Sequence, residues 1–189
     1  MYWMKLKHSL LLTASTLFIF LSANSHAGRE GVNAYYGLGL AATSIKYVDP
    51  APTGQIIVGV EEDGWALEAI GYGSTEVGSD DPETDFSISG KDIGLAFRTI
   101  EKNERYYKFK YSITDLDLKD KETIASVTTT TTTATSGKSY TIGMGFRTSR
   151  VNRVEVDYTY HNSDDISDAV HFISLKYLWG GAPYHGTSF

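Results

Sequence analysis

The sequence predicts an all-β protein, an eight-stranded antiparallel up-and-down transmembrane β-barrel. Eight short segments alternate large apolar residues with small or charged ones, which is the period of two typical of strands. The connections between these segments alternate between long and short to the end of the chain. The apolar residues are too numerous and too large to fit inside an eight-stranded barrel, so we expect them to face outward, toward lipid.

Each predicted strand has one apolar face. Between Tyr140 and Phe146, for example, Tyr140, Ile142 and Met144 share one face, whereas Thr141 and Gly143 share the other. The predicted strands, with their apolar residues, are 33–45 (Tyr36, Leu38, Leu40), 55–61 (Ile56, Val58, Val60), 65–73 (Trp65, Leu67), 91–99 (Ile93, Leu95, Phe97), 105–114 (Tyr107, Phe109, Tyr111, Ile113), 138–148 (Tyr140, Ile142, Met144, Phe146), 153–161 (Val154, Val156, Tyr158, Tyr160) and 169–179 (Ile173, Leu175, Tyr177, Trp179).

Two kinds of connection join these strands. Tight turns are predicted at 62–64, 100–104 and 149–152, and longer loops at 46–54, 74–90, 115–137 and 162–168. Outer-membrane barrels place short turns in the periplasm and long loops outside the cell. The sequence therefore predicts that the four longer loops face outward from a bacterial surface.

Residues 1–27 are predicted to be a secretory signal peptide. Lys5 and Lys7 precede an apolar run at 10–21, and Ser25-His26-Ala27 has small residues where cleavage occurs. Residues 28–189 then form a single barrel domain in the outer membrane of a Gram-negative bacterium. Of the 17 lysines and arginines, 15 remain against 23 acids, and this net charge of −8 argues against nucleic acid as a partner. No cysteine is present, so disulfides cannot stabilise the fold.

Aromatic residues gather near the strand ends at the short-turn side, where they are expected to form an interfacial girdle. This predicted aromatic girdle comprises Tyr36, Trp65, Phe97, Tyr107, Phe146 and Trp179.

Charged residues occupy the opposite strand faces and are expected to line the lumen. They are Glu61, Glu68, Arg98, Lys108, Lys110, Arg147, Glu155, Asp157 and Lys176. Because an unpaired ion is costly in so narrow a space, five cations and four anions should pair with one another. We expect an ionic network that plugs the lumen, with a narrow porin-type channel as the alternative.

No catalytic residue, metal ligand or cofactor site is predicted. Lipid A deacylases are also eight-stranded barrels and have a His-x-Ser pair with a glutamate about a dozen residues later. His161 and Ser163 are similar to that pair, but position 173 is Ile. His161 also shares the face assigned to the lumen, away from any lipid substrate. The acids of 74–90 have the spacing of no standard calcium loop. A lipid-modifying enzyme remains the alternative function.

Six consecutive threonines, Thr128 to Thr133, lie in the longest loop. Threonine favours extended backbone, so loop 115–137 either continues its flanking strands as a protruding hairpin or forms a flexible polar loop. A hairpin would expose a strand edge to a host or surface ligand.

The chain resembles the small outer-membrane barrels typified by the OmpA transmembrane domain and the OmpX/Ail adhesion group. The resemblance rests on Tyr35-Tyr36-Gly37-Leu38-Gly39, on the strand and loop rhythm, and on the closing segment from Phe172 to Trp179. The resemblance implies recognition of a final aromatic residue by the barrel-assembly machinery, for which Trp179 and Phe189 are both candidates. We expect a non-enzymatic scaffold, held in outer-membrane lipid and lipopolysaccharide, whose loops mediate surface interaction or adhesion.

Overall fold

A computed structural model describes residues 32–46, 48–78, 84–99, 104–124, 126–149, 151–163, 166 and 168–181. The predicted signal peptide, residues 1–27, and Phe189 lie outside these residues. Within them, no helix is long and apolar enough to cross a membrane.

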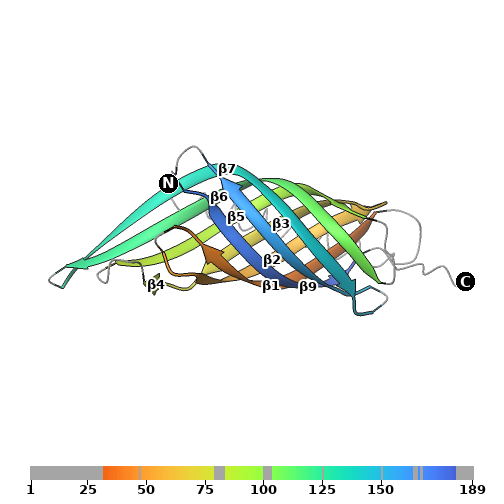
Figure 1. The fold of residues 1–189 in the computed structure, drawn as a ribbon, viewed down its shortest axis with the longest axis horizontal. Helices are drawn as coiled ribbons and strands as arrows, with labels where there is room; N and C mark the ends of the chain where they lie inside the picture. Colours follow the sequence, from red (N-terminus) through yellow and green to blue (C-terminus); the bar gives the residue numbers. More distant parts are fainter. Residues whose placement is uncertain are drawn as a thin grey trace, which may run out of the picture.

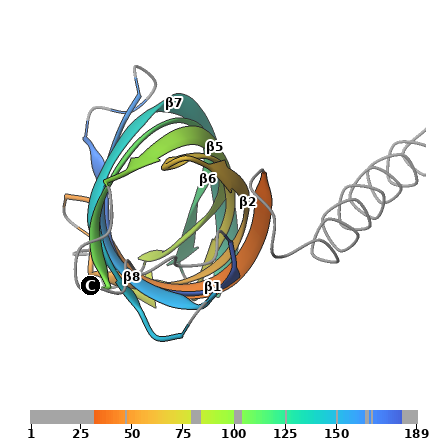
Figure 2. The same cartoon turned by 90° about the vertical axis from the view of Figure 1, so that its right-hand side faces the viewer.

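The described chain forms a closed antiparallel barrel (Figures 1 and 2). Its strands are β1 (Asn33–Ser44), β2 (Ala51–Glu62), β3 (Trp65–Ser74), β4 (Val77–Gly78), β5 (Thr84–Arg98), β6 (Arg105–Ile124), β7 (Val127–Arg147), β8 (Arg153–Asn162) and β9 (Val170–Gly180). Apart from β3 and β4, neighbours in sequence pair around the ring; β3 pairs with β5, and β9 pairs with β1. The two-residue β4 adds to β5 beyond the end of β3, so eight strands close the barrel.

The predicted tight turn at 62–64 is confirmed in its details. Glu62 pairs with Trp65, which leaves Asp63 and Gly64 as a two-residue hairpin loop with φ of 47° and 82°. Two consecutive positive φ angles define a type I′ turn, the turn whose twist matches that of the flanking strands. The Asp-Gly pair therefore fixes the register of β2 against β3.

The eight predicted strands are confirmed, but three of the predicted long loops are wrong in extent. Residues 51–54 of the predicted loop 46–54 belong to β2. Most of 74–90 belongs to β4 and β5, and almost all of 115–137 belongs to β6 and β7. The hairpin interpretation of the threonine run is thus the correct one: Thr128–Thr133 lie in β7, which pairs with β6 up to Ile124 and Val127. Figure 1 shows this β6–β7 hairpin projecting beyond the other strands at the end opposite the short turns.

Part of the way along the barrel, the apolar residues move from the outward to the inward face of the strands. The alternation of inward and outward side chains itself continues without a break. On β6, Tyr107 to Ile113 alternate apolar outward residues with polar inward ones such as Lys108 and Ser112. From Asp115 to Lys119 the outward residues are charged, and the inward ones are Leu116 and Leu118, both buried. The barrel therefore has an apolar exterior near the short turns and an apolar interior near the hairpin.

The same inversion occurs on β5, so the change lies at one level of the barrel. Ile93 and Leu95 point outward in the part next to the short turns, whereas Phe86 and Ile88 point inward near the hairpin. Lys91 and Asp115 face each other across the pair at the transition, with 3.6 Å between Nζ and Oδ2. An apolar exterior is stable in lipid, whereas an apolar interior with a charged exterior is stable in water. This level therefore marks a change from lipid to water around the barrel.

The predicted outward faces are confirmed as well. Every apolar residue assigned to the outside of the eight strands is exposed or half-buried, and none is buried. The large exposed residues include Leu40, Ile56 and Tyr107. So much exposed apolar surface is incompatible with water around this part of the barrel.

Candidate functional site: a layered lumen

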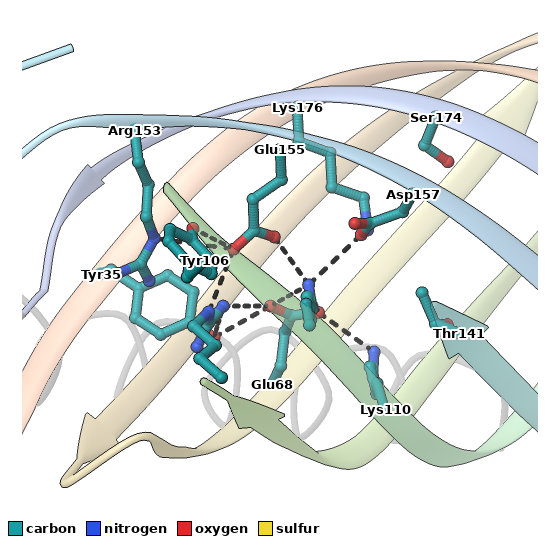
Figure 3. Close-up of polar contacts among 12 residues, drawn as sticks. Tyr35, Glu68, Tyr106, Lys110, Thr141, Arg153, Glu155, Asp157, Ser174 and Lys176 are labelled. Carbon is teal, nitrogen blue, oxygen red and sulfur yellow. Dashed lines mark hydrogen bonds and ion pairs between the residues drawn. The ribbon is translucent and has the colours of Figure 1, made fainter. Parts of the chain in front are cut away.

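Among the described residues, ten buried charged side chains occupy the half of the lumen nearest the short turns, and Figure 3 shows most of them. Five are cations and five are anions: Arg98, Lys108, Lys110, Arg153 and Lys176, with Glu61, Glu68, Asp92, Glu155 and Asp157. They come from six strands, β2, β3, β5, β6, β8 and β9. The cluster carries no net formal charge. The attraction between opposite charges therefore offsets the free-energy cost of removing the ions from water.

Lys108 is the centre of this ionic cluster. Its Nζ lies 3.0 Å from Glu68 Oε1, 2.7 Å from Glu155 Oε2 and 3.3 Å from Asp157 Oδ2. The side chains of Lys108, Glu68 and Glu155 have no solvent-exposed area. One ammonium therefore holds carboxylates from β3 and β8, on opposite walls of the barrel.

Two arginines connect the cluster toward the short turns. Arg98 donates from Nε to Glu155 at 3.0 Å, from Nη1 to Glu61 at 3.1 Å and from Nη2 to Glu68 at 3.2 Å. Arg153 binds Glu61 with both terminal nitrogens, each at 2.8 Å. This bidentate arrangement fixes the plane of both groups as well as their separation.

Two inward tyrosines, Tyr35 and Tyr106, complete the packing around the arginines. The Tyr35 ring lies 4.7 Å from Arg153 Cζ and 5.0 Å from Arg98 Cζ, and its hydroxyl donates to Glu68 at 2.9 Å. The Tyr106 hydroxyl donates to Glu155 at 2.7 Å. Both rings lie over glycines of the neighbouring strands, Gly59 and Gly145, where a Cβ would collide with the ring. Those glycines make the room that two aromatic rings need inside so small a barrel.

A second layer of uncharged polar groups lies next along the axis. Asp92 accepts hydrogen bonds from Lys110 and Ser112, and also from Thr114 at 3.2 Å. Thr114 in turn bonds Ser139 at 2.7 Å, and Ser139 lies 3.0 Å from His161 Nδ1. These hydroxyls connect the ionic cluster to the middle of the barrel.

The third layer, toward the hairpin, is apolar. It comprises the buried residues Tyr72, Phe86, Ile88, Leu116, Leu118, Val170 and Phe172, with Ile45, Val48 and Ile166 packed partly against them. Tyr72 and Phe172 have ring centroids 5.0 Å apart. From the short turns to the hairpin, the lumen is therefore ionic, then hydroxylic, then hydrophobic.

Of the nine predicted lumen ions, the structure brings eight together: Glu61, Glu68, Arg98, Lys108, Lys110, Glu155, Asp157 and Lys176. Arg147 lies half-buried at the end of β7, and its cross-strand partner Arg153 supplies the fifth cation of the cluster. Sequence reasoning missed Arg153 and Asp92. Parity could have found both, because each shares the inward face of its strand with a predicted ion, Glu155 and Arg98 respectively.

The predicted girdle residues all face outward. Tyr36 stacks on Trp179 with ring centroids 5.6 Å apart, and Trp65 contacts Phe97 at 5.0 Å. Tyr107 is exposed, whereas Phe146 is half-buried beneath the Arg105 guanidinium, 5.8 Å from its Cζ. Cross-strand contacts thus assemble part of the predicted girdle into pairs.

His161 and Ser163 both point into the lumen and are buried. The ring partner of His161 is Ser139, and Ser163 bonds Thr135 and donates to the Ser136 carbonyl at 2.9 Å. His161 Nε2 has no hydrogen-bond partner among the described residues. Within the same residues, no group of three or more His, Asp or Glu side chains is arranged to hold a metal ion. A nucleophile here would be walled off from lipid outside the barrel.

Comparison with known proteins identifies the fold. No protein-family model and no curated protein sequence matches the chain. Neisserial surface protein A superposes with a TM-score of 0.57 at 10% identity, over 78% of this chain and 96% of its own. Ail of Yersinia pestis gives 0.55 at 13%, over 80% and 99%, and OprG of Pseudomonas aeruginosa gives 0.58 at 9%, over 80% and 98%. The chain therefore has the fold of the small eight-stranded outer-membrane barrels.

Proposed function

We propose that this chain is an integral outer-membrane protein without enzymatic activity, whose barrel is a scaffold and whose β6–β7 hairpin contacts a partner at the cell surface. In this arrangement the short turns lie in the periplasm, and the level of Lys91 and Asp115 lies at the outer boundary of the membrane. The hairpin then projects from the cell.

One observation carries the proposal: β7 has an unpaired edge. β7 pairs with β6 along its full length but with β8 only from Lys138 to Arg147. Ser163 covers the edge near Thr135 and Ser136. Among the described residues, Val127 to Ala134 therefore have a strand on one side only. Such an edge offers backbone donors and acceptors to any extended segment that approaches it.

Charge narrows the class of partner. The predicted outer segments 46–54, 74–90, 115–137 and 162–168 together contain 13 acidic and 3 basic residues. Ail has been solved with the heparin analogue sucrose octasulfate, a polyanion. An acidic surface would repel such a ligand, so for this chain we propose an extended peptide segment that is neutral or cationic.

The contents of the lumen favour a scaffold over a channel or a lipid-modifying enzyme. Ten paired ions occupy the bore beside the short turns, which disfavours a conducting path. His161 and Ser163 are enclosed by the barrel, which disfavours chemistry on a membrane lipid.

The test is a binding comparison on whole cells with and without the protein, against immobilised proteins, polysaccharides and host cells. Deleting all of 115–137 would also remove the buried Leu116 and Leu118, so a shorter deletion is needed. Leu118 and Thr133 are cross-strand partners, and an Asn-Gly turn can replace Lys119 to Thr132, which removes most of the open edge and keeps both leucines. This variant should insert normally and lose binding.

A matched control replaces Thr128–Thr133 with serines, which preserves the backbone edge. We expect it to bind like the wild type. Binding by the shortened hairpin would refute the proposal, and loss of binding in the serine variant would assign recognition to the threonine side chains instead of the edge.

A further inference from the structure

The apolar layer of the lumen ends in a cavity that opens toward the hairpin side. The cavity has a volume of about 350 Å³, and its apolar walls are Ile45, Val48, Phe86, Leu118 and Ile166. This volume is at the lower end of the range of small-molecule sites, about 300–1,000 Å³.

The cavity is closed on its inner side. Ile88, Leu116 and Phe172 are each at most 1% exposed and pack in the same hydrophobic cluster as Phe86 and Leu118. Beyond them lie the hydroxyl layer and the ionic cluster. A molecule that enters from the hairpin side therefore meets an apolar floor, with the hydroxyl layer and the ionic cluster beyond it.

Among the described residues that line the cavity, the charged ones are two carboxylates. Asp120 and Asp168 contribute to its wall together with Thr133. The lysines that flank Asp120 point to the other face of β6, and Lys121 there pairs with Glu76 at 3.2 Å. An apolar ligand with a positive group placed beside Asp120 satisfies this lining, whereas an anionic group there would be repelled by the Asp120 carboxylate.

We propose that this cavity binds small amphipathic cations, with the apolar body against Phe86 and Leu118 and the ammonium group beside Asp120. The hydrophobic walls supply most of the binding free energy. Asp120 is exposed, so its attraction to the ligand is screened and should favour a cation over a neutral analogue by roughly two- to fivefold. This site is separate from the β7 edge, which lies on the backbone of the hairpin.

Three probes of one shape test the proposal: 4-phenylbutylammonium, neutral 4-phenylbutanol and anionic 4-phenylbutyrate. Binding is followed with the full-length mature protein in lipid nanodiscs, by the chemical shifts of the methyl groups of Val48, Leu118 and Ile166. The ammonium compound should bind most tightly, and the shifts should be confined to these methyl groups. Absence of binding up to millimolar concentration, or equal affinity for the alcohol, would overturn the proposal.

Variants separate the two parts of the site. Asp120→Asn should make the ammonium and the alcohol bind equally, whereas Asp117→Asn, an outward residue on the same strand, should preserve the preference. Thr133→Phe, which fills the cavity from β7 with a residue favoured in strands, should abolish binding of all three probes. A preference that survives Asp120→Asn, or unchanged binding in Thr133→Phe, would place the ligand elsewhere.

Discussion

Lys108 is the residue whose loss should disturb the barrel most. Lys108→Met removes the ammonium that contacts Glu68, Glu155 and Asp157, and it leaves five buried anions against four cations. Breaking a fully buried ion pair by removing one partner costs about 3–5 kcal/mol, because a charge is left uncompensated. We expect the free energy of unfolding to fall by about that amount.

A second substitution should recover much of this loss. Glu68→Gln in the Lys108→Met background restores four anions to four cations. Each remaining ion keeps a partner, since Arg98 retains Glu155 at 3.0 Å and Lys110 retains Asp92. A buried ion pair replaced by uncharged groups is often neutral in stability, so the double variant should be more stable than Lys108→Met alone.

The assay is urea unfolding of the barrel in lipid vesicles, followed by the fluorescence of Trp65 and Trp179. Lys91→Met is the control: its ion pair with Asp115 is exposed, with 71% of the lysine side chain accessible, and should contribute less than about 1 kcal/mol. If Lys108→Met unfolds within about 0.5 kcal/mol of the wild type, or if the two substitutions are additive, the buried cluster does not stabilise the barrel as described.

Three further outcomes follow from the same geometry. Leu95→Arg and Ile142→Arg should impair assembly in membranes, because a cation at mid-bilayer depth costs about 2–4 kcal/mol. Asp117→Arg should assemble normally, because this residue faces outward beyond the proposed membrane boundary. Assembly is measured by heat-modifiable migration on a gel, and equal assembly of all three variants would contradict the assigned faces. Planar-bilayer recordings should show no stable conductance, because ten ions fill the bore, and reproducible openings would favour a channel. His161→Ala and Ser163→Ala should leave lipid A acylation unchanged by mass spectrometry, and an altered acylation pattern would instead favour the enzyme.

The alternation of apolar and polar residues was sufficient to predict the eight strands. It failed to predict how far β5 and β6 extend, because there the apolar residues move to the inward face. Asp115-Leu116-Asp117-Leu118 continues the alternation of β6, yet the apolar residues change from the outward to the inward face. A search for apolar residues on one fixed face therefore ends the strand at Thr114. If the alternation is followed without requiring the apolar residues to stay on one face, the predicted strand extends into the hairpin.

Most of the charged residues that line the lumen were predicted from the sequence, but the way they pair was not. Parity identifies which charged residues point inward, but not which cation meets which carboxylate, because partners such as Arg153 and Glu61 come from strands 92 positions apart in the chain. Tyr35 and Tyr36 are adjacent, and one must face the lumen. That Tyr35 fits there depends on Gly59 of the neighbouring strand, a register that the sequence alone does not reveal.

We propose that β6 passes from lipid to the cell exterior at the level of Asp115. Because the chain contains no cysteine, single cysteines can be placed from Tyr107 to Glu122 and treated on intact cells with a membrane-impermeant maleimide. Cysteines at outward positions 115, 117 and 119 should react, whereas those at 107, 109, 111 and 113 should react only with a lipid-soluble reagent. Reaction of position 109 or 111 with the impermeant reagent, or protection of 117 and 119, would show that β6 does not leave the membrane at Asp115.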